Sequence, residues 1–267
     1  MANNRLKFIL ESQDLIVPAQ CGFRKNRSSL DHLLNLEHDI LSTFDKKDFL
    51  VTCFLDLERA YDMAWRRGIL QKLYALGLRG NLPIFIQNFL FGRTFSVKVQ
   101  DCFSTVRIQE NGVPQGSVLS PTLFMILIND ILPAPPRNLK YSLYADDVAI
   151  WHSSPNARFS ASRVQLALDS LQEWSDEWGF KFSELKSTVV LFSRRAQAEI
   201  NLQLHGNPIP VQTTTFFLGL RLDSRLNWKA HVKYLVNAYN KIFMKLPRLV
   251  GNPVIAIATR LLGALLP

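Results

Sequence analysis

The sequence predicts an α+β fold in which a split βαβ sheet packs against helices on one face. Two observations carry this prediction. Short apolar runs typical of strands alternate with longer segments in which apolar residues recur at helical spacing. Their order is strand, helix-rich insertion, helix, two adjacent short strands, long helix and strand, which is the order of a split βαβ sheet. Hydrophobic residues make up 48% of the 267 positions, enough for a packed core.

The first part of the chain predicts a helix, a buried strand and an insertion. Residues 28–47 form the helix, because Ser28 or Ser29 can cap it and leucines follow at helical spacing. Residues 49–55 are nearly all apolar, as in a buried strand. The residues expected near one face of the helix are Leu30, Leu33, Leu34, Leu41 and Phe44. The insertion predicts two helices and a hairpin, over residues 68–78, 82–91, 94–99 and 103–109.

The second part predicts the remainder of the sheet. Ser120 and Pro121 open a helix that runs to about Leu132, since serine caps well and proline is tolerated in the first turn. Two short strands, 141–144 and 148–151, meet at Ala145-Asp146-Asp147. The remaining elements are a long amphipathic helix, two strands and a last helix, over residues 158–178, 188–193, 215–222 and 228–246.

Charge and composition narrow the class of protein. The formal net charge of +9 suits a polyanionic partner, although a merely basic soluble protein has the same balance. The three cysteines form no C-x-x-C pair and the histidines form no H-E-x-x-H motif, so we expect reduced thiols and no zinc. No apolar run is long enough to span a bilayer and no signal peptide opens the chain. We therefore expect a soluble intracellular protein without a membrane partner.

Two acidic segments are candidates for chemistry. Asp56 follows the buried strand at 49–55, where a carboxylate is costly unless it is paired or binds a metal ion. The alternative is that Asp56 merely begins a turn. Asp146 and Asp147 lie together at a hairpin tip, where a divalent cation is the natural compensation for two close negative charges. Aspartate is also favoured in turns, so this pair alone is weak evidence.

A glycine-containing loop is the third candidate. Residues 111–117 precede the helix that begins at Ser120. Gly112 and Gly116 allow the backbone to approach a ligand closely, and the side-chain amide of Gln115 could position a base or sugar. An ordinary loop between a hairpin and a helix is the alternative.

In combination, the order and spacing of Asp56, the Gln115 loop and the Asp146-Asp147 pair resemble the reverse transcriptase family, specifically reverse transcriptases of non-LTR retrotransposons. The resemblance spans roughly residues 4–246. Four further segments resemble family motifs, namely residues 20–28, 178–187, 217–219 and 226–231.

The resemblance implies a right-hand polymerase palm with the split βαβ, ferredoxin-like plan, partial fingers and the start of a thumb. The implied division is partial fingers over 1–48, palm over 49–195 with an insertion at 66–110, a primer-grip hairpin region over 196–222, and the start of a thumb over 223–267. No basic fingers hairpin precedes Gln20, and residues 251–267 match a thumb only loosely. We therefore expect a domain cut short at both ends, with weak or no polymerase activity on its own.

The resemblance also implies a chemistry, RNA-directed DNA synthesis from an RNA template, a DNA primer and deoxynucleoside triphosphates. Asp56, Asp146 and Asp147 would hold two Mg²⁺ ions, or Mn²⁺, with the carbonyl of Leu57 as a further ligand. Lys186 would protonate the leaving pyrophosphate. The implied substrate contacts are Tyr61 against the sugar, Gln115 and Gly116 at the incoming nucleotide or template, Arg24 and Arg27 on template phosphates, and Leu218 and Gly219 at the primer.

Two other interpretations stay open at this point. One is a non-catalytic nucleic-acid-binding scaffold derived from the palm, which would have no need of three acids that repel one another and the substrate. The other is a relative of group II intron or telomerase reverse transcriptases. The segment Phe217-Leu218-Gly219 and the context of Trp228 suit non-LTR elements better. Asp62 is expected to be structural and to pair with Arg66 one helical turn away.

Overall fold

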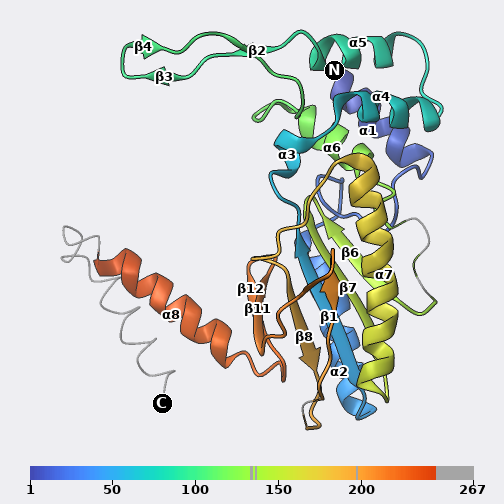
Figure 1. The fold of residues 1–267 in the computed structure, drawn as a ribbon, viewed down its shortest axis with the longest axis vertical. Helices are drawn as coiled ribbons and strands as arrows, with labels where there is room; N and C mark the ends of the chain where they lie inside the picture. Colours follow the sequence, from blue (N-terminus) through green and yellow to red (C-terminus); the bar gives the residue numbers. More distant parts are fainter. Residues whose placement is uncertain (133–134, 136, 197, 245–267) are drawn as a thin grey trace.

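The centre of the fold is a four-stranded antiparallel sheet (Figure 1). The computed structural model describes residues 1–132, 135, 137–196 and 198–244, so residues 245–267 of the expected thumb lie outside the described residues. The strand order is β6-β7-β1-β8. Their bounds are β6 (Lys140–Tyr144), β7 (Asp147–Ser154), β1 (Phe49–Asp56) and β8 (Thr188–Phe192). With α6 (Ser120–Leu127) before β6, and α7 (Ala157–Trp178) before β8, the split βαβ plan is confirmed.

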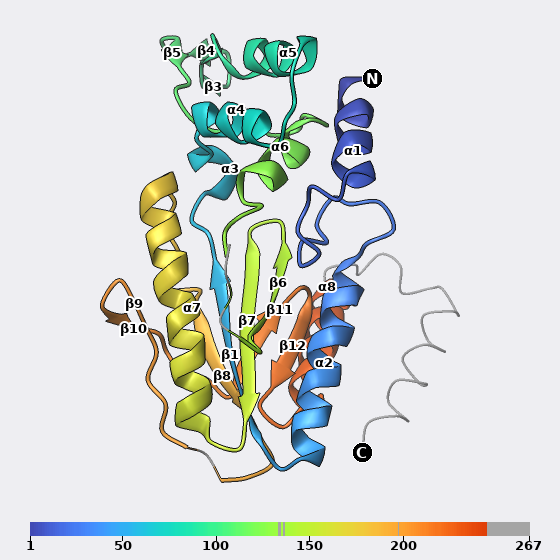
Figure 2. The same cartoon turned by 90° about the vertical axis from the view of Figure 1, so that its right-hand side faces the viewer.

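Both faces of the sheet are covered, which the sequence analysis did not predict. Val51 and Leu55 of β1 pack with α7, whereas Leu50 and Phe54 pack against α2 (Ser29–Asp45). Figure 2 shows α7 and α2 on opposite sides of the sheet. The expectation of helices on one face only was therefore wrong. The reason lies in β1 itself, because an almost continuous apolar run presents apolar side chains to both faces and each face needs a cover.

The buried face of α2 also differs from the prediction. Leu36, Ile40 and Phe44 are buried at a spacing of four residues. The leucines on which the prediction relied are largely exposed, namely Leu30, Leu34 and Leu41. The helix begins as predicted, since the backbone amide of Ser28 donates to Asp31 Oδ2 at 2.7 Å. The spacing of the leucines predicted the wrong buried face, because the residues that face the core include Ile40 and a buried histidine, His32.

The face that carries α2 is completed by a hairpin. The single strand expected over 215–222 is in fact two strands, β11 (Thr214–Phe217) and β12 (Leu220–Asp223). Leu218 and Gly219 form the turn, both with positive φ, which ends one strand and starts the next. The ring of Phe217 lies 5.0 Å from that of Phe54, so the hairpin seals this part of the core. Helix α8 (Lys229–Met244) follows and projects away from the sheet (Figure 1).

The insertion between β1 and α6 forms a separate layer above the sheet (Figure 1). Its helices are α3 (Ala60–Met63), α4 (Arg66–Ala75) and α5 (Asn81–Leu90), and its ribbon consists of β2 (Thr94–Phe95), β3 (Lys98–Val99), β4 (Cys102–Phe103) and β5 (Arg107–Ile108). Four elements were not predicted, namely α1 (Ala2–Ser12), α3, β9 (Gln203–Leu204) and β10 (Asn207–Pro208). Within the described residues, no helix is long and apolar enough to cross a membrane.

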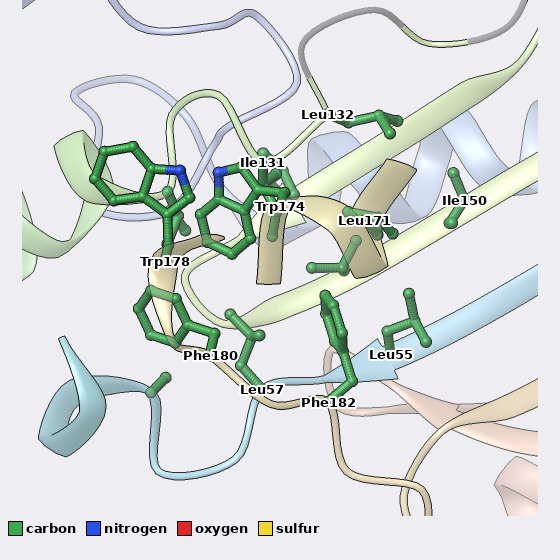
Figure 3. Packing of buried hydrophobic residues seen from close by; sticks show 14 of the residues in the cluster. Leu55, Leu57, Ile131, Leu132, Ile150, Leu171, Trp174, Trp178, Phe180 and Phe182 are labelled. Atoms are coloured by element: carbon green, nitrogen blue, oxygen red, sulfur yellow. The ribbon is translucent and has the colours of Figure 1, made fainter. Parts of the chain in front are cut away.

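An aromatic core joins the sheet to the insertion (Figure 3). Trp174 and Phe180 stack with ring centroids 5.3 Å apart, and Phe180 meets Phe124 edge to face at 6.3 Å. Phe124 in turn stacks on Tyr61 at 4.8 Å. Trp178 and Phe182 are also buried. These successive ring contacts pack against Tyr61 and support the backbone of its segment.

Candidate active site

The pairing of β1 with β7 brings the acidic residues together. In this antiparallel ladder Asp56 lies directly opposite Asp147. β6 and β7 are joined by a two-residue turn, Ala145 and Asp146, because Tyr144 pairs with Asp147. Residues opposite one another in an antiparallel pair have neighbouring side chains. Asp56, Asp146 and Asp147 therefore meet at one end of the sheet, where β1 ends and β7 begins.

The charges of these acids are crowded and partly buried. Burial, and then the charges of Asp146 and Asp56, raises the pKa of Asp147 to about 6. Burial chiefly raises the pKa of Asp146 as well, with a further contribution from Asp56. Lys186 Nζ donates to Asp56 Oδ2 at 2.9 Å, and this hydrogen bond raises the pKa of the lysine. One ammonium group thus faces three carboxylates.

The donor chemistry suits a divalent cation, but the side chains are not arranged as a finished site. Carboxylate oxygens are the ligands that Mg²⁺ prefers, and a cation would relieve the repulsion that raises the pKa of Asp147. In the described part of the chain, no group of three or more His, Cys, Asp or Glu side chains is placed to hold a metal ion. Asp56 is paired with Lys186 instead. A metal ion bound at Asp56 Oδ2 would therefore displace the lysine from that oxygen.

The backbone beyond β1 is held by the turn that follows α7. The amide of Ser183 donates to the carbonyl of Asp56, and the amide of Glu58 donates to the carbonyl of Lys181, both at 2.8 Å. Leu57 stands opposite Phe182 between these two bonds. In such a pair the carbonyl of Leu57 faces away from the neighbouring strand. This orientation leaves the Leu57 carbonyl available on the other side, as its expected role as a ligand requires.

The Tyr61 segment and the Gln115 loop are packed together. The amide of Val113 donates to the carbonyl of Tyr61 at 2.9 Å, and Gln115 Nε2 donates to Asp62 Oδ1 at 3.0 Å. A Cβ atom at Gly112 would lie 2.8 Å from the carbonyl oxygen of Asp62, so only glycine allows this approach. Burial, and then the charge of Asp146, raises the pKa of Tyr61 to about 12. The structure therefore places Tyr61 beside the acids, with Gln115 nearby.

Arg66 holds the Gln115 loop, a role that the sequence analysis missed. The side chain is 2% exposed and donates to three loop carbonyls, those of Gly112 at 2.7 Å, Gln109 at 2.5 Å and Asn111 at 3.2 Å. Arg66 thus bonds to backbone carbonyls, whereas Asp62 accepts from Gln115, so the expected pair of Asp62 with Arg66 is not formed. No sequence motif announces this contact, because the acceptors lie more than forty residues further along the chain.

A cavity of about 530 Å³ opens beside the acids. Asp56, Asp147 and Lys186 line one side of it. The other side comes from the β11–β12 hairpin and its neighbours, including Gln212, Phe216, Arg221 and Tyr234. The turn residues Leu218 and Gly219, expected at the primer, do not line the cavity. Arg221 and Tyr234 were missed, and for Arg221 the available signal was the alternation of apolar and polar residues along 220–223.

Comparison with known proteins settles the family. The family model for reverse transcriptase (RNA-dependent DNA polymerase) matches residues 1–235. The chain belongs to the reverse transcriptase family. Its relatives include the probable RNA-directed DNA polymerase from transposon BS of Drosophila melanogaster, which is 30% identical over 239 residues. Another is the RNA-directed DNA polymerase from mobile element jockey of Drosophila funebris, 31% identical over 253 residues.

These relatives are longer proteins. The alignments cover 86% and 90% of this chain but only 26% and 27% of the BS and jockey polymerases. This reverse transcriptase chain therefore spans about a quarter of the relatives that it matches. The resemblance to non-LTR retrotransposon reverse transcriptases is confirmed by them.

Solved structures confirm the palm-like fold. Telomerase from Candida albicans in complex with a TWJ fragment of telomeric RNA matches with a TM-score of 0.59 and 15% identity, over 83% of this chain and 36% of that one. Apo telomerase from Candida tropicalis, truncated from its C-terminal domain, matches with a TM-score of 0.59 and 14% identity, over 84% of this chain and 43% of that one. At such identities the likeness shows the fold alone.

Arg24 does not fit the contact with template phosphate that the resemblance implied. Its guanidinium donates to both carboxylate oxygens of Glu11, at 2.9 and 2.6 Å, and to the carbonyls of Val17 and Gln20, both at 3.3 Å. Only 7% of its side chain is exposed. Arg24 therefore ties α1 to the segment that follows it, while Arg27 remains exposed to solvent. The sequence could not show this, because Glu11 belongs to an unpredicted helix.

The Arg66 contacts give a direct prediction for stability. Arg66→Met removes three charge-assisted hydrogen bonds and leaves loop carbonyls without a donor, so the free energy of unfolding should fall by about 3 kcal/mol. Arg67→Met, on the exposed side of the same helix, should change it by less than about 0.5 kcal/mol. Urea denaturation of both variants measures the difference. Equal effects would show that Arg66 does not hold the loop.

Proposed function

We propose that this chain carries the nucleotidyl-transfer centre of an RNA-directed DNA polymerase. It would join a deoxynucleoside triphosphate to the 3′-hydroxyl of a DNA primer on an RNA template. The observation that carries the proposal is the register of β1 and β7, which sets Asp56 opposite Asp147 and beside Asp146. Membership of the family supports it, and so do the BS and jockey relatives, which are named as RNA-directed DNA polymerases.

The proposed cofactor is a pair of Mg²⁺ ions, for which Mn²⁺ can substitute. Asp56, Asp146 and Asp147 would hold them, with the Leu57 carbonyl as an additional ligand. Bound metal ions of this kind activate the attacking hydroxyl and neutralise charge on the leaving pyrophosphate. A metal ion that binds Asp56 Oδ2 would displace Lys186, and this release would free an ammonium group at the edge of the cavity.

The other residues act on the substrates. Lys186, once free, donates a proton to the departing pyrophosphate. Tyr61 sits against the sugar, where its ring excludes a ribose 2′-hydroxyl. The remaining proposed contacts are Gln115 and Gly116 at the incoming nucleotide or template, Arg27 at template phosphate, and Leu218 and Gly219 at the primer.

The proposed domain division follows the same resemblance. Residues 1–48 belong to the fingers, 49–195 to the palm with its insertion at 66–110, and 196–222 to the primer-grip region. Residues 223–267 begin the thumb.

Primer extension tests the function itself. With an RNA template, a DNA primer and Mg²⁺, we expect the chain to extend the primer only weakly, and Asp146→Asn should reduce that rate by about 10³-fold, since metal stabilisation of the transition state amounts to several kcal/mol. Asp45→Asn makes the same chemical change at the exposed end of α2 and should leave the rate unaltered. An Asp146→Asn variant as fast as the parent would contradict the proposal.

The pair of Lys186 and Asp56 predicts a split between metal binding and turnover. Lys186→Gln removes the cation that competes for Asp56, so Mn²⁺ should bind more tightly in a titration followed by electron paramagnetic resonance. Turnover should nevertheless fall by about 10²-fold, because the proton donor is lost. Lys181→Gln, in the same turn and also exposed, should change neither quantity. Weaker Mn²⁺ binding in Lys186→Gln would exclude competition between lysine and metal.

The position of Tyr61 predicts the choice of sugar. Tyr61→Val opens the space that the ring fills, so the preference for deoxynucleotides over ribonucleotides should fall by about 10- to 100-fold. Tyr74→Val, on an exposed part of α4, serves as the control. Steady-state incorporation of dNTP and NTP measures the ratio. An unchanged ratio in Tyr61→Val would assign the tyrosine to core packing with Phe124 alone.

A further inference from the structure

We propose that Gly22, together with Gln20, is a positioning residue for the turn that carries Asp146 and Asp147. Resting on the proposed function, this inference assigns a part of the metal site to a segment more than a hundred residues away in the sequence. The segment 19–22 lies along β6, the edge strand of the sheet. The backbone of this segment, rather than a charged side chain, determines the position of the turn at Ala145 and Asp146.

Backbone hydrogen bonds fix the segment to the strand that leads into the turn. The amide of Cys21 donates to the carbonyl of Leu143 at 3.0 Å, and the amide of Leu143 donates to the carbonyl of Ala19 at 2.9 Å. Gln20 and Leu143 thus form a parallel bridge that occupies the outer edge of β6. Three residues after Leu143 the chain reaches Asp146.

Gly22 lies against the turn itself. A Cβ atom built on Gly22 would lie 2.6 Å from the backbone nitrogen of Ala145 and 3.3 Å from the carbonyl carbon of Tyr144. Real Cβ atoms essentially never come within 3.0 Å of another heavy atom, and a backbone nitrogen cannot move aside as a flexible side chain can. Gly22 does not have the positive φ that favours glycine elsewhere. Glycine is therefore required here for close approach alone.

The turn that Gly22 supports is itself strained. Ala145 has φ of 56°, a left-handed conformation that costs an alanine free energy and persists only when surrounding contacts enforce it. Gln20 shapes the segment that lies against this turn, because its Oε1 accepts a hydrogen bond from the amide of Gly22 at 2.7 Å. Gln20 is fully buried, and its Nε2 has no hydrogen-bond partner among the described residues. Burying the Nε2 donor of Gln20 without a partner costs free energy. We infer that the hydrogen bond from Gly22 to Oε1 of Gln20 offsets this cost.

A side chain at residue 22 would push the segment and the turn apart. The displacement would pass directly to Asp146, the residue after Ala145, and to Asp147, the first residue of β7. Displacing a catalytic group by about 1 Å can lower a rate by about 10²-fold. The expected signature is a defect in metal binding and turnover rather than in substrate binding.

The test compares Gly22→Ala with Gly80→Ala in the full chain. Gly80 has open space around it but φ of 79°, so alanine there costs stability without a clash near the acids. Gly22→Ala should weaken Mn²⁺ binding about 10-fold in the absence of nucleic acid, and lower kcat by about 10- to 100-fold with KM for dNTP unchanged. Gly80→Ala should leave both quantities at the parent values. Thermal unfolding identifies a temperature at which each variant is folded.

A second variant covers the case in which Gly22→Ala does not fold. Gln20→Met keeps the volume of the side chain and removes the hydrogen bond to Gly22, so it should shift Mn²⁺ affinity and kcat in the same direction by a smaller factor. Parent-like values in a folded Gly22→Ala or Gln20→Met variant, or equal losses in Gly80→Ala, would overturn the proposal. If Asp146→Asn extends the primer as fast as the parent, the proposed function fails while the comparison of Mn²⁺ affinities still decides the role of Gly22.

Discussion

The antiparallel pairing of β1 with β7 is the constraint on which the rest of the structure depends. Its register sets Asp56 opposite Asp147 and leaves Asp146 in the connecting turn. Burying carboxylates close together is unfavourable, and burial, followed by the charges of Asp146 and Asp56, raises the pKa of Asp147. The two apolar faces of β1 offset this cost. Both faces are covered, one by α7 and the other by α2 with the β11–β12 hairpin, so the strand cannot slip without exposing its core residues.

Three distant segments then fix the surroundings of the acids through their backbones. Residues 19–22 lie along the edge of β6, next to the turn. Residues 181–183 pair with the chain just beyond Asp56. The loop at 109–115 is tied to the Tyr61 segment and held by the guanidinium of Arg66. A site built on strand ends and braced by backbone bonds has little freedom to rearrange, and Lys186, on an exposed turn, is its most adjustable charged group.

The sequence predicted what local pattern and charge encode. The apolar run of β1, the short strands around Asp146 and Asp147, and the periodic helix α7 all appear where expected. Several misses depend on a partner that lies outside the local sequence pattern. Arg24 is engaged by Glu11 in a helix that was not predicted, and Arg66 by carbonyls beyond helix α5 and the ribbon that follows it. The inward face of α2 was likewise decided by the sheet it covers, not by its own leucines.

The central claim is that Asp56, Asp146 and Asp147 together form a cation site in which a metal ion replaces Lys186 on Asp56. A crystal structure of the chain grown with Mn²⁺, with anomalous diffraction measured at the manganese edge, tests this most directly. The account predicts anomalous density bounded by these three aspartates, with Lys186 Nζ no longer within hydrogen-bonding distance of Asp56. Manganese absent from the three acids, with Lys186 still bonded to Asp56, would contradict it.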